Sequence, residues 1–215
     1  MPSTLHSADL PANETRQGGS FGRSLPWLLL VGGLIGLTAA FVLTVEKFAL
    51  ALDPAYAPTC SINPVLNCGS VMDTPQASAF GFPNSLLGIA GFAVVAAVGA
   101  ALLAGAVFAQ WFWGAMQVGV TAAAVFVHWL IAQSLYDIGA LCPYCMAVWA
   151  VTVPIFWYVT LRNLDRARSK SALGQWFRLW LDSLIRNHSI PLTVWFLALI
   201  ALIAQRFWSY WSTLL

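Results

Sequence analysis

Long stretches without a charged residue alternate with short polar segments along this chain. Asp, Glu, Lys and Arg are absent from residues 24–45, 74–136, 138–161 and 187–205. A helix needs about 20 apolar residues to cross the hydrocarbon core of a bilayer. The second run is about three times that length, so we expect it to contain two spans joined by a hairpin. The pattern therefore predicts five transmembrane helices. They cover Leu25–Val45, Asn84–Leu103, Phe112–Tyr136, Cys142–Leu161 and Ile190–Phe207.

The composition agrees with this pattern. Hydrophobic residues make up 60% of the chain and charged residues 8%, whereas soluble domains have about 25% charged residues. So few charges exclude a soluble globular enzyme, and a net charge of +2 does not favour a nucleic-acid partner. Backbone polar groups in lipid must be satisfied within the segment, so the spans are expected to be helical. The sequence predicts an all-α integral membrane protein in contact with membrane lipid.

The basic residues are distributed unequally between the two sides of this topology. One side has only Lys47 and Arg206. Lys and Arg accumulate in cytoplasmic loops, which predicts a multi-pass protein of the cytoplasmic membrane with its N-terminus inside and its C-terminus outside. The loop Glu46–Pro83 and the link Asp137–Leu141 then lie outside. The inner side has the other eight basic residues: Arg16, Arg23, Arg162, Arg166, Arg168, Lys170, Arg178 and Arg186.

Three further segments complete the predicted organisation. Residues 1–24 are expected to form a disordered cytoplasmic tail, and the apolar run after it is too long for a cleaved signal peptide. Residues 162–189 form a cytoplasmic loop with an amphipathic helix, which lies in the membrane interface or packs against the spans. Residues 190–215 contain the fifth span and a short outer tail.

All four cysteines fall on the outer side of this topology. Disulfides persist on the oxidising side of a membrane, so this placement favours disulfide chemistry. Cys142 and Cys145 form a C-P-Y-C motif where the fourth span begins. Proline suits the first helical position, which places Cys145 in the first turn, where the helix N-terminus favours a thiolate. Cys60 and Cys68 form a looser pair in a proline-rich loop, where they could exchange with other thiols.

Three interpretations use these cysteines. The first is a relay that passes electrons between the two pairs. The second is a membrane scaffold or transporter subunit with two structural disulfides, although transport pathways usually contain the charged residues that these spans lack. The third is a zinc site of four thiolates, which would leave the five spans without a role. We favour the relay and predict no metal.

The cysteines belong to a longer pattern, which resembles the vitamin K epoxide reductase family and most of all its bacterial, DsbB-like members. The resemblance covers about residues 25–161. It implies a four-helix core around a quinone site, with the outer loop at 46–83, and a fifth helix in bacterial members. The residues that carry it are Cys60 and Cys68, Gly69-Ser70-Val71, Thr74, Phe80-Gly81-Phe82-Pro83, Gly88 and Cys142-Pro143-Tyr144-Cys145.

The resemblance also implies a thiol:quinone oxidoreductase and a direction of electron flow. An exported thioredoxin-like (DsbA-like) oxidase would pass two electrons to Cys60 and Cys68, and these would pass them to Cys142 and Cys145. A quinone, menaquinone or ubiquinone, would then be reduced beside Cys145, while Cys142 exchanges with the loop. Because few residues follow the fifth span, the partner is expected to act in trans.

Four further residues are expected to contact the quinone together with Cys145: Thr74, Phe80, His128 and Trp149. Thr74 replaces the serine common in the family and keeps a hydroxyl that can hydrogen-bond a carbonyl. Trp149 stands where the animal enzymes have tyrosine, so epoxide reduction is not expected. His128 is an ionisable residue inside a span and thus a candidate site residue. The alternative for His128 is a neutral ring bonded to a neighbouring helix.

Overall fold

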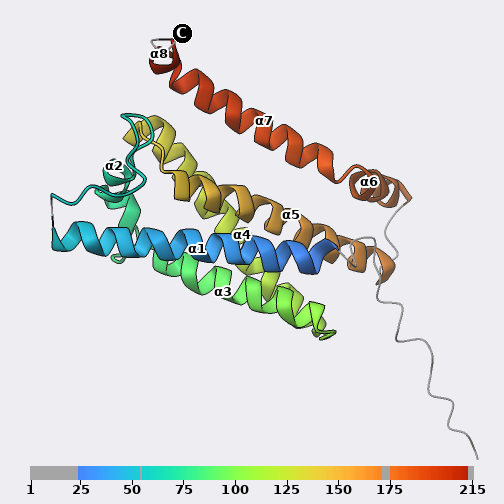
Figure 1. Cartoon of the computed structure of the whole chain (residues 1–215). Coiled ribbons are helices and arrows are strands. Elements are labelled where there is room, and N and C mark those ends of the chain that lie inside the picture. Colours follow the sequence, from blue (N-terminus) through green and yellow to red (C-terminus); the bar gives the residue numbers. More distant parts are fainter. Residues whose placement is uncertain (1–23, 54, 171–174, 213–215) are drawn as a thin grey trace, which may run out of the picture.

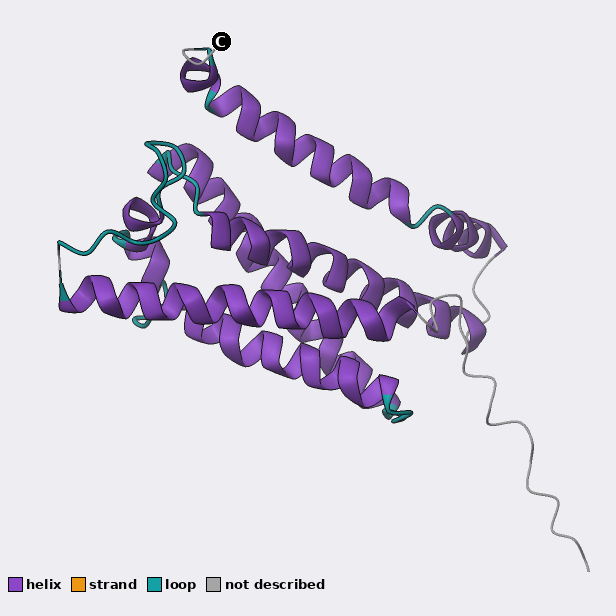
Figure 2. Ribbon diagram, in the orientation of Figure 1, coloured by secondary structure: helices purple, strands orange, loops and turns teal. Residues whose placement is uncertain are grey.

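The structure, a computed structural model, describes residues 24–53, 55–170 and 175–212. Within these ranges every regular element is a helix (Figure 2). The predicted tail over 1–24 lies almost entirely outside the described residues. The elements are α1 (Ser24–Leu52), α2 (Cys68–Met72), η1 (Pro75–Ser78), α3 (Asn84–Leu103), α4 (Gln110–Ala132), η2 (Gln133–Ile138), α5 (Pro143–Lys170), α6 (Gln175–Arg186), α7 (Ser189–Arg206) and α8 (Trp208–Trp211).

Five of these helices are long and apolar enough to cross a membrane, which confirms the predicted all-α membrane fold. One boundary is corrected. The predicted outer loop begins at Glu46, but α1 continues to Leu52, so Glu46 and Lys47 are helical. The first charge ends the apolar run without ending the helix, because the Glu46 carboxylate is buried and hydrogen-bonded by residues of the loop. The fourth span is also longer than predicted, since α5 continues beyond Leu161.

Helices α1, α3, α4 and α5 form a bundle in which α1 lies against α3 and α5, and α4 lies against α5 (Figure 1). The contact between α1 and α3 is very close. A Cβ atom added to Gly33 would lie 2.6 Å from the backbone nitrogen of Ala96. Transmembrane helices associate mainly through van der Waals packing, and small residues allow their backbones to approach.

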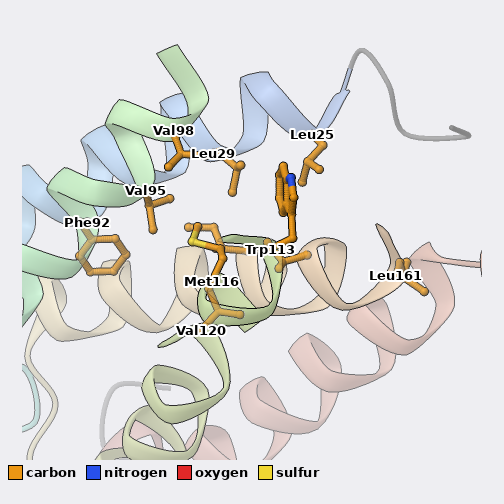
Figure 3. Close-up of a cluster of buried hydrophobic side chains, with 11 residues drawn as sticks. Leu25, Leu29, Phe92, Val95, Val98, Trp113, Met116, Val120 and Leu161 are labelled. Carbon is orange, nitrogen blue, oxygen red and sulfur yellow. The ribbon is translucent and has the colours of Figure 1, made fainter. Parts of the chain in front are cut away.

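The largest cluster of buried apolar side chains lies between these four helices, away from the cysteines. Figure 3 shows Leu29 of α1, Val95 and Val98 of α3 and Trp113 and Met116 of α4 converging there. Trp113 is 1% exposed, and the guanidinium of Arg162 lies 3.3 Å from its ring centroid. A cation over an indole face is attracted by the ring quadrupole, and this contact ties α5 to α4.

The amphipathic helix expected between the fourth and fifth spans is present as α6. Its Leu181 is buried, and Leu184 and Ile185 pack against the bundle core. Trp176 and Trp180 are exposed. The helix therefore packs partly against the spans, as one of the two alternatives predicts.

Helix α7 contacts the bundle at its cysteine-bearing end. The last turn of the third span, η2, is a π-helix, and such turns disturb the regular backbone ladder. Arg206 of α7 donates from Nε to the carbonyl oxygen of Leu135 in this turn, at 2.7 Å. Phe207 is buried nearby in a cluster with Leu135 and Trp149. The fifth span is thus attached beside the C-P-Y-C motif.

Candidate active site

The two cysteine pairs predicted from the sequence come together in space. Cys60 and Cys68 form a disulfide, and Cys142 and Cys145 are free thiols. The Cys68 Sγ lies 2.9 Å from the Cys142 Sγ. The sulfur atoms of Cys60, Cys68 and Cys142 all lie within 4.8 Å of one another, and the three residues are buried. Cys68 is therefore the loop cysteine beside the C-P-Y-C motif, which the sequence had left open.

A short backbone pairing aligns the segment before Cys68 with the segment before Cys142. Leu66 and Leu141 form an isolated parallel bridge. The Asn67 N–H donates to the carbonyl of Leu141 at 2.9 Å, and the Leu141 N–H donates to the carbonyl of Val65 at 2.7 Å. Cys68 lies two residues after Leu66 and Cys142 directly follows Leu141, so the pairing brings their side chains together.

Local sequence fixes both ends of this pairing. The Asn67 side chain accepts a hydrogen bond from the Ser70 N–H and caps α2, which begins at Cys68. Before Cys142, η2 is followed by its C-cap residue Gly139, which has a φ of 69°. Glycine adopts this left-handed conformation without steric cost. The turn directs the chain from the third span towards Cys142.

Cys142 lies directly before α5 and receives the hydrogen bonds of its first turn. A hydrogen bond from the Cys145 thiol is the largest cause that lowers the pKa of the Cys142 thiol, and the backbone N–H groups of Cys145 and Tyr144 lower it further. Burial acts in the opposite direction. The sequence argument assigned the helix N-terminus to Cys145, and this is corrected: its N–H groups stabilise the Cys142 thiolate, the form that attacks a disulfide.

A cavity of about 680 Å³ adjoins Cys145, which forms part of its wall. The lining comes from α1, α3, α4, α5 and the loop between α1 and α3, and it is mainly apolar. This volume lies within the usual range for small-molecule sites, about 300–1,000 Å³. Apolar walls with a few polar groups and a thiol fit a lipid-soluble quinone. The polar side chains of the lining are Lys47, Thr74, Gln76, Asn84, Ser85, Ser134 and Thr152.

The sequence model of the Vitamin K epoxide reductase family matches residues 27–160. The chain belongs to this family. The match includes all four cysteines and the four-helix bundle, while α6, α7 and α8 lie outside it. The comparison with curated proteins finds no match. Membership of the vitamin K epoxide reductase family makes the chain a membrane oxidoreductase of disulfide and quinone chemistry.

Three of the four additional quinone contacts expected from the sequence line the cavity of this family member: Thr74, Phe80 and Trp149. Phe80 packs against Phe126 with ring centroids 5.4 Å apart. The Thr74 hydroxyl donates its one proton to the carbonyl of Val71 at 2.8 Å, so it must rotate before it can donate to a quinone carbonyl.

His128 is not among the residues that line the cavity. Its Nδ1 lies 2.7 Å from the carbonyl oxygen of Ala124, and its Nε2 accepts from Trp195 Nε1 at 2.9 Å. A carbonyl only accepts and an indole N–H only donates, so the geometry requires the neutral Nδ1-protonated ring. This is the alternative weighed for His128, a ring bonded to a neighbouring helix, here α7. The lining of the cavity therefore gives no support to the predicted contact between His128 and a quinone.

Sequence reasoning missed Glu46, which is 4% exposed and lies near the disulfide. Its carboxylate accepts from the Thr59 hydroxyl at 2.6 Å and from the Thr59 N–H at 3.3 and 3.4 Å, directly before Cys60. Tyr56 also hydrogen-bonds Glu46, and this bond is the main reason that the pKa of Tyr56 is raised. Glu46 thus anchors the segment that leads into Cys60. The available signal was a charged pair, Glu46-Lys47, directly after an apolar run.

Asn84 and Gln76 were also missed as residues of the cavity wall. The Asn84 Nδ2 donates to the carbonyl of Gln76 at 2.6 Å, and its Oδ1 accepts from the Ala79 N–H. The Gln76 Nε2 donates to Asp137 Oδ2 at 2.6 Å. These bonds join η1 to α3 and η2 at the wall of the cavity. No local pattern marks them, because each bond depends on the fold.

Proposed function

We propose that the chain is a thiol:quinone oxidoreductase that oxidises an exported thioredoxin-like protein and reduces a quinone, and so supports disulfide formation outside the cytoplasm. The observation that carries this proposal is the 2.9 Å contact between Cys68 Sγ and Cys142 Sγ. Thiol–disulfide exchange requires the attacking sulfur to reach the target sulfur directly. The contact joins the loop disulfide to the motif whose second cysteine lies in the cavity wall.

The relay begins with an oxidised motif. The Cys142 and Cys145 thiols form a disulfide and give up two electrons and two protons, which a quinone held in the cavity would accept. The partner dithiol reduces the Cys60–Cys68 disulfide and leaves with a disulfide of its own. The Cys68 thiolate then attacks Cys142 Sγ, and Cys145 leaves as the thiolate. Cys60 attacks Cys68 Sγ and releases Cys142.

The arrangement in the structure matches the product that this exchange would leave. The loop pair is oxidised and the C-P-Y-C thiols are free. Two electrons have moved from the loop pair to the motif, and Cys145 lies in the cavity wall. The lowered pKa of Cys142 also favours its release, because a thiol of low pKa is the better leaving group.

The location of the partner follows from the proposed orientation. With most basic residues inside, the cysteines face the exported compartment of the cytoplasmic membrane. Cys60 is 5% exposed and Cys68 is fully buried, and Ile62, two residues after Cys60, is 69% exposed. We therefore assign the contact with the partner to Cys60 and the contact with the motif to Cys68. Cys60 becomes accessible once its segment moves away from Glu46.

A turnover measurement tests the proposal. The purified chain in lipid nanodiscs is mixed with a reduced, exported thioredoxin-like protein and a short-chain quinone, and quinone absorbance and partner thiols are followed together. The proposal predicts one quinol formed for each partner disulfide, with no turnover in Cys142→Ala. Partner oxidation without quinol formation, or no oxidation at all, would reject it and favour a scaffold with static disulfides.

A further inference from the structure

We infer that Lys47 is a catalytic residue of this site, whose ammonium donates a hydrogen bond and supplies positive charge to an oxygen of the quinone beside Cys145. The inference rests on the proposed function and extends it to a residue that neither the cysteine pattern nor the family motif includes. It starts from the chemical character of the cavity. Among the described residues, Lys47 is the one charged residue in a lining that is otherwise apolar or neutral.

The position of the Lys47 side chain is fixed by the loop. Its Nζ donates to the carbonyl oxygen of Met72, the last residue of α2. Met72 is buried in the same cluster as Cys68 and Cys142, and Cys145 packs against that cluster. Leu43, one helical turn before Lys47, also packs there. The ammonium therefore lies at the thiol end of the cavity.

The carbonyl of Met72 leaves two N–H donors of Lys47 without an acceptor from that contact, and the cavity wall determines what they can bind. An ammonium has three N–H donors, and the carbonyl of Met72 takes one. Lys47 is half-buried, and an apolar wall offers few acceptors for the other two. A cation held in such a wall is costly unless it meets an acceptor or an anion. A carbonyl oxygen of a ligand seated against Cys145 provides that acceptor.

The position also suits the redox step. When Cys142 and Cys145 form their disulfide, the two electrons would pass from the thiols to the quinone in the cavity. Negative charge therefore develops in a low-dielectric space, where a preorganised cation is worth far more than in water. This stabilisation lowers the barrier of the transfer.

A rival role for Lys47 is structural: its bond to Met72 could simply hold α2 in place. The two roles differ in what the charge does. A purely structural lysine would act on the contact between Cys68 and Cys142, which requires no quinone. A catalytic lysine would act on quinone affinity and on the absorbance of a thiolate–quinone pair, and arginine would replace it.

The test compares Lys47→Met with Lys47→Arg in the full-length chain. Quinone affinity is measured by tryptophan quenching in a background without Cys142 and Cys145 thiols. We expect about tenfold weaker binding for Lys47→Met and a change of at most about threefold for Lys47→Arg, as for loss of a charged hydrogen bond. In Cys142→Ser, the quinone-dependent charge-transfer band should fade with Lys47→Met and persist with Lys47→Arg.

A quinone-free control separates the two roles. In Cys145→Ala, the yield of the Cys68–Cys142 cross-link should be the same with Lys47 and with Met at that position. A lower cross-link yield, an unchanged quinone affinity in Lys47→Met, or equal losses in the Met and Arg variants would overturn the inference. Binding that is insensitive to Lys47→Met overturns this inference alone. Absence of quinone binding to the unsubstituted chain would overturn the proposed function as well.

Discussion

The two cysteine pairs meet at one point, but they are held in opposite ways. Cys142 directly precedes a long transmembrane helix and Cys145 lies in its first turn, and backbone N–H groups of that turn hydrogen-bond the Cys142 sulfur. Cys60 and Cys68 lie between α1 and α3, in a segment that α1 holds through side-chain hydrogen bonds, chiefly those that the Glu46 carboxylate accepts from Thr59. A few side-chain hydrogen bonds break and re-form more readily than the backbone hydrogen bonds of a long helix. The Cys60–Cys68 pair can therefore move while the Cys142–Cys145 pair stays beside the cavity.

The largest effect is expected from Cys68→Ala, which prevents the Cys60–Cys68 disulfide from forming. The free Cys60 thiolate can still attack the disulfide of an oxidised partner, so that one partner thiol leaves and a mixed disulfide forms, but no loop thiol remains to resolve that bond. Turnover should fall below detection, and a heavier band that collapses on reduction should contain Cys60 joined to the partner. Cys60→Ala serves as the matched control. Equal amounts of partner adduct in the two variants would contradict the assignment of Cys60 to the partner and of Cys68 to the C-P-Y-C motif.

A smaller effect is expected from Glu46→Gln, which weakens the anchor of the loop. A buried charged hydrogen bond contributes about 1.5–3 kcal/mol. We expect the two-electron transfer from the loop to Cys142 and Cys145 to slow about tenfold, while quinone affinity stays the same. Stopped-flow thiol trapping measures the transfer.

Thr59→Val provides the control for the Glu46 prediction, since it removes the hydroxyl partner of the same carboxylate. Residues in one hydrogen-bond network are not additive, so the double variant should be little worse than Glu46→Gln alone. Fully additive losses would show that Glu46 acts elsewhere than on the loop.

The next prediction concerns the pH dependence of the Cys142–Cys145 pair. The Cys145 thiol is the largest cause of the lowered pKa of Cys142, so Cys145→Ala should raise that pKa. The thiolate is lost as pH falls through the pKa, so alkylation of Cys142 in the reduced chain should need a higher pH in this variant. Cys145→Ser, which keeps a donor, should stay closer to the unsubstituted chain. Peptide mapping after timed alkylation measures the midpoints, and identical midpoints in all three would contradict the assigned cause.

Much of this site could be predicted from the sequence, because the signals were local. Charge-free runs identify the five helices, and C-P-Y-C before an apolar run places Cys142 and Cys145 at a helix start. Glu46 and Lys47 were missed because their hydrogen-bond partners, Thr59 and the carbonyl of Met72, are brought near them only by the fold. The proximity of Cys68 to Cys142 likewise depends on a pairing across 74 positions of sequence. No periodicity reports such a contact.

The smallest effects are expected where the two pairs are not involved. Thr74→Ala removes one neutral hydroxyl from the cavity wall. Once this hydroxyl turns from Val71 to a quinone carbonyl, its loss should weaken quinone binding by about 1 kcal/mol, or about fivefold. His128→Phe should leave quinone affinity unchanged, because His128 bonds Trp195 outside the cavity. Quenching titrations compare the two variants directly. A larger loss for His128→Phe than for Thr74→Ala would return His128 to the quinone site.

The proposed relay depends on exchange between Cys68 and Cys142, and this step can be tested by trapping their mixed disulfide. In Cys145→Ala the leaving thiol of the motif is absent, so a disulfide between Cys142 and Cys68 has no neighbour in the motif to resolve it. Peptide mapping of this variant under non-reducing conditions should recover a Cys68–Cys142 cross-link, with Cys60 as a free thiol. Recovery of the Cys60–Cys68 pair alone, with Cys142 unpaired under every redox condition, would contradict the relay.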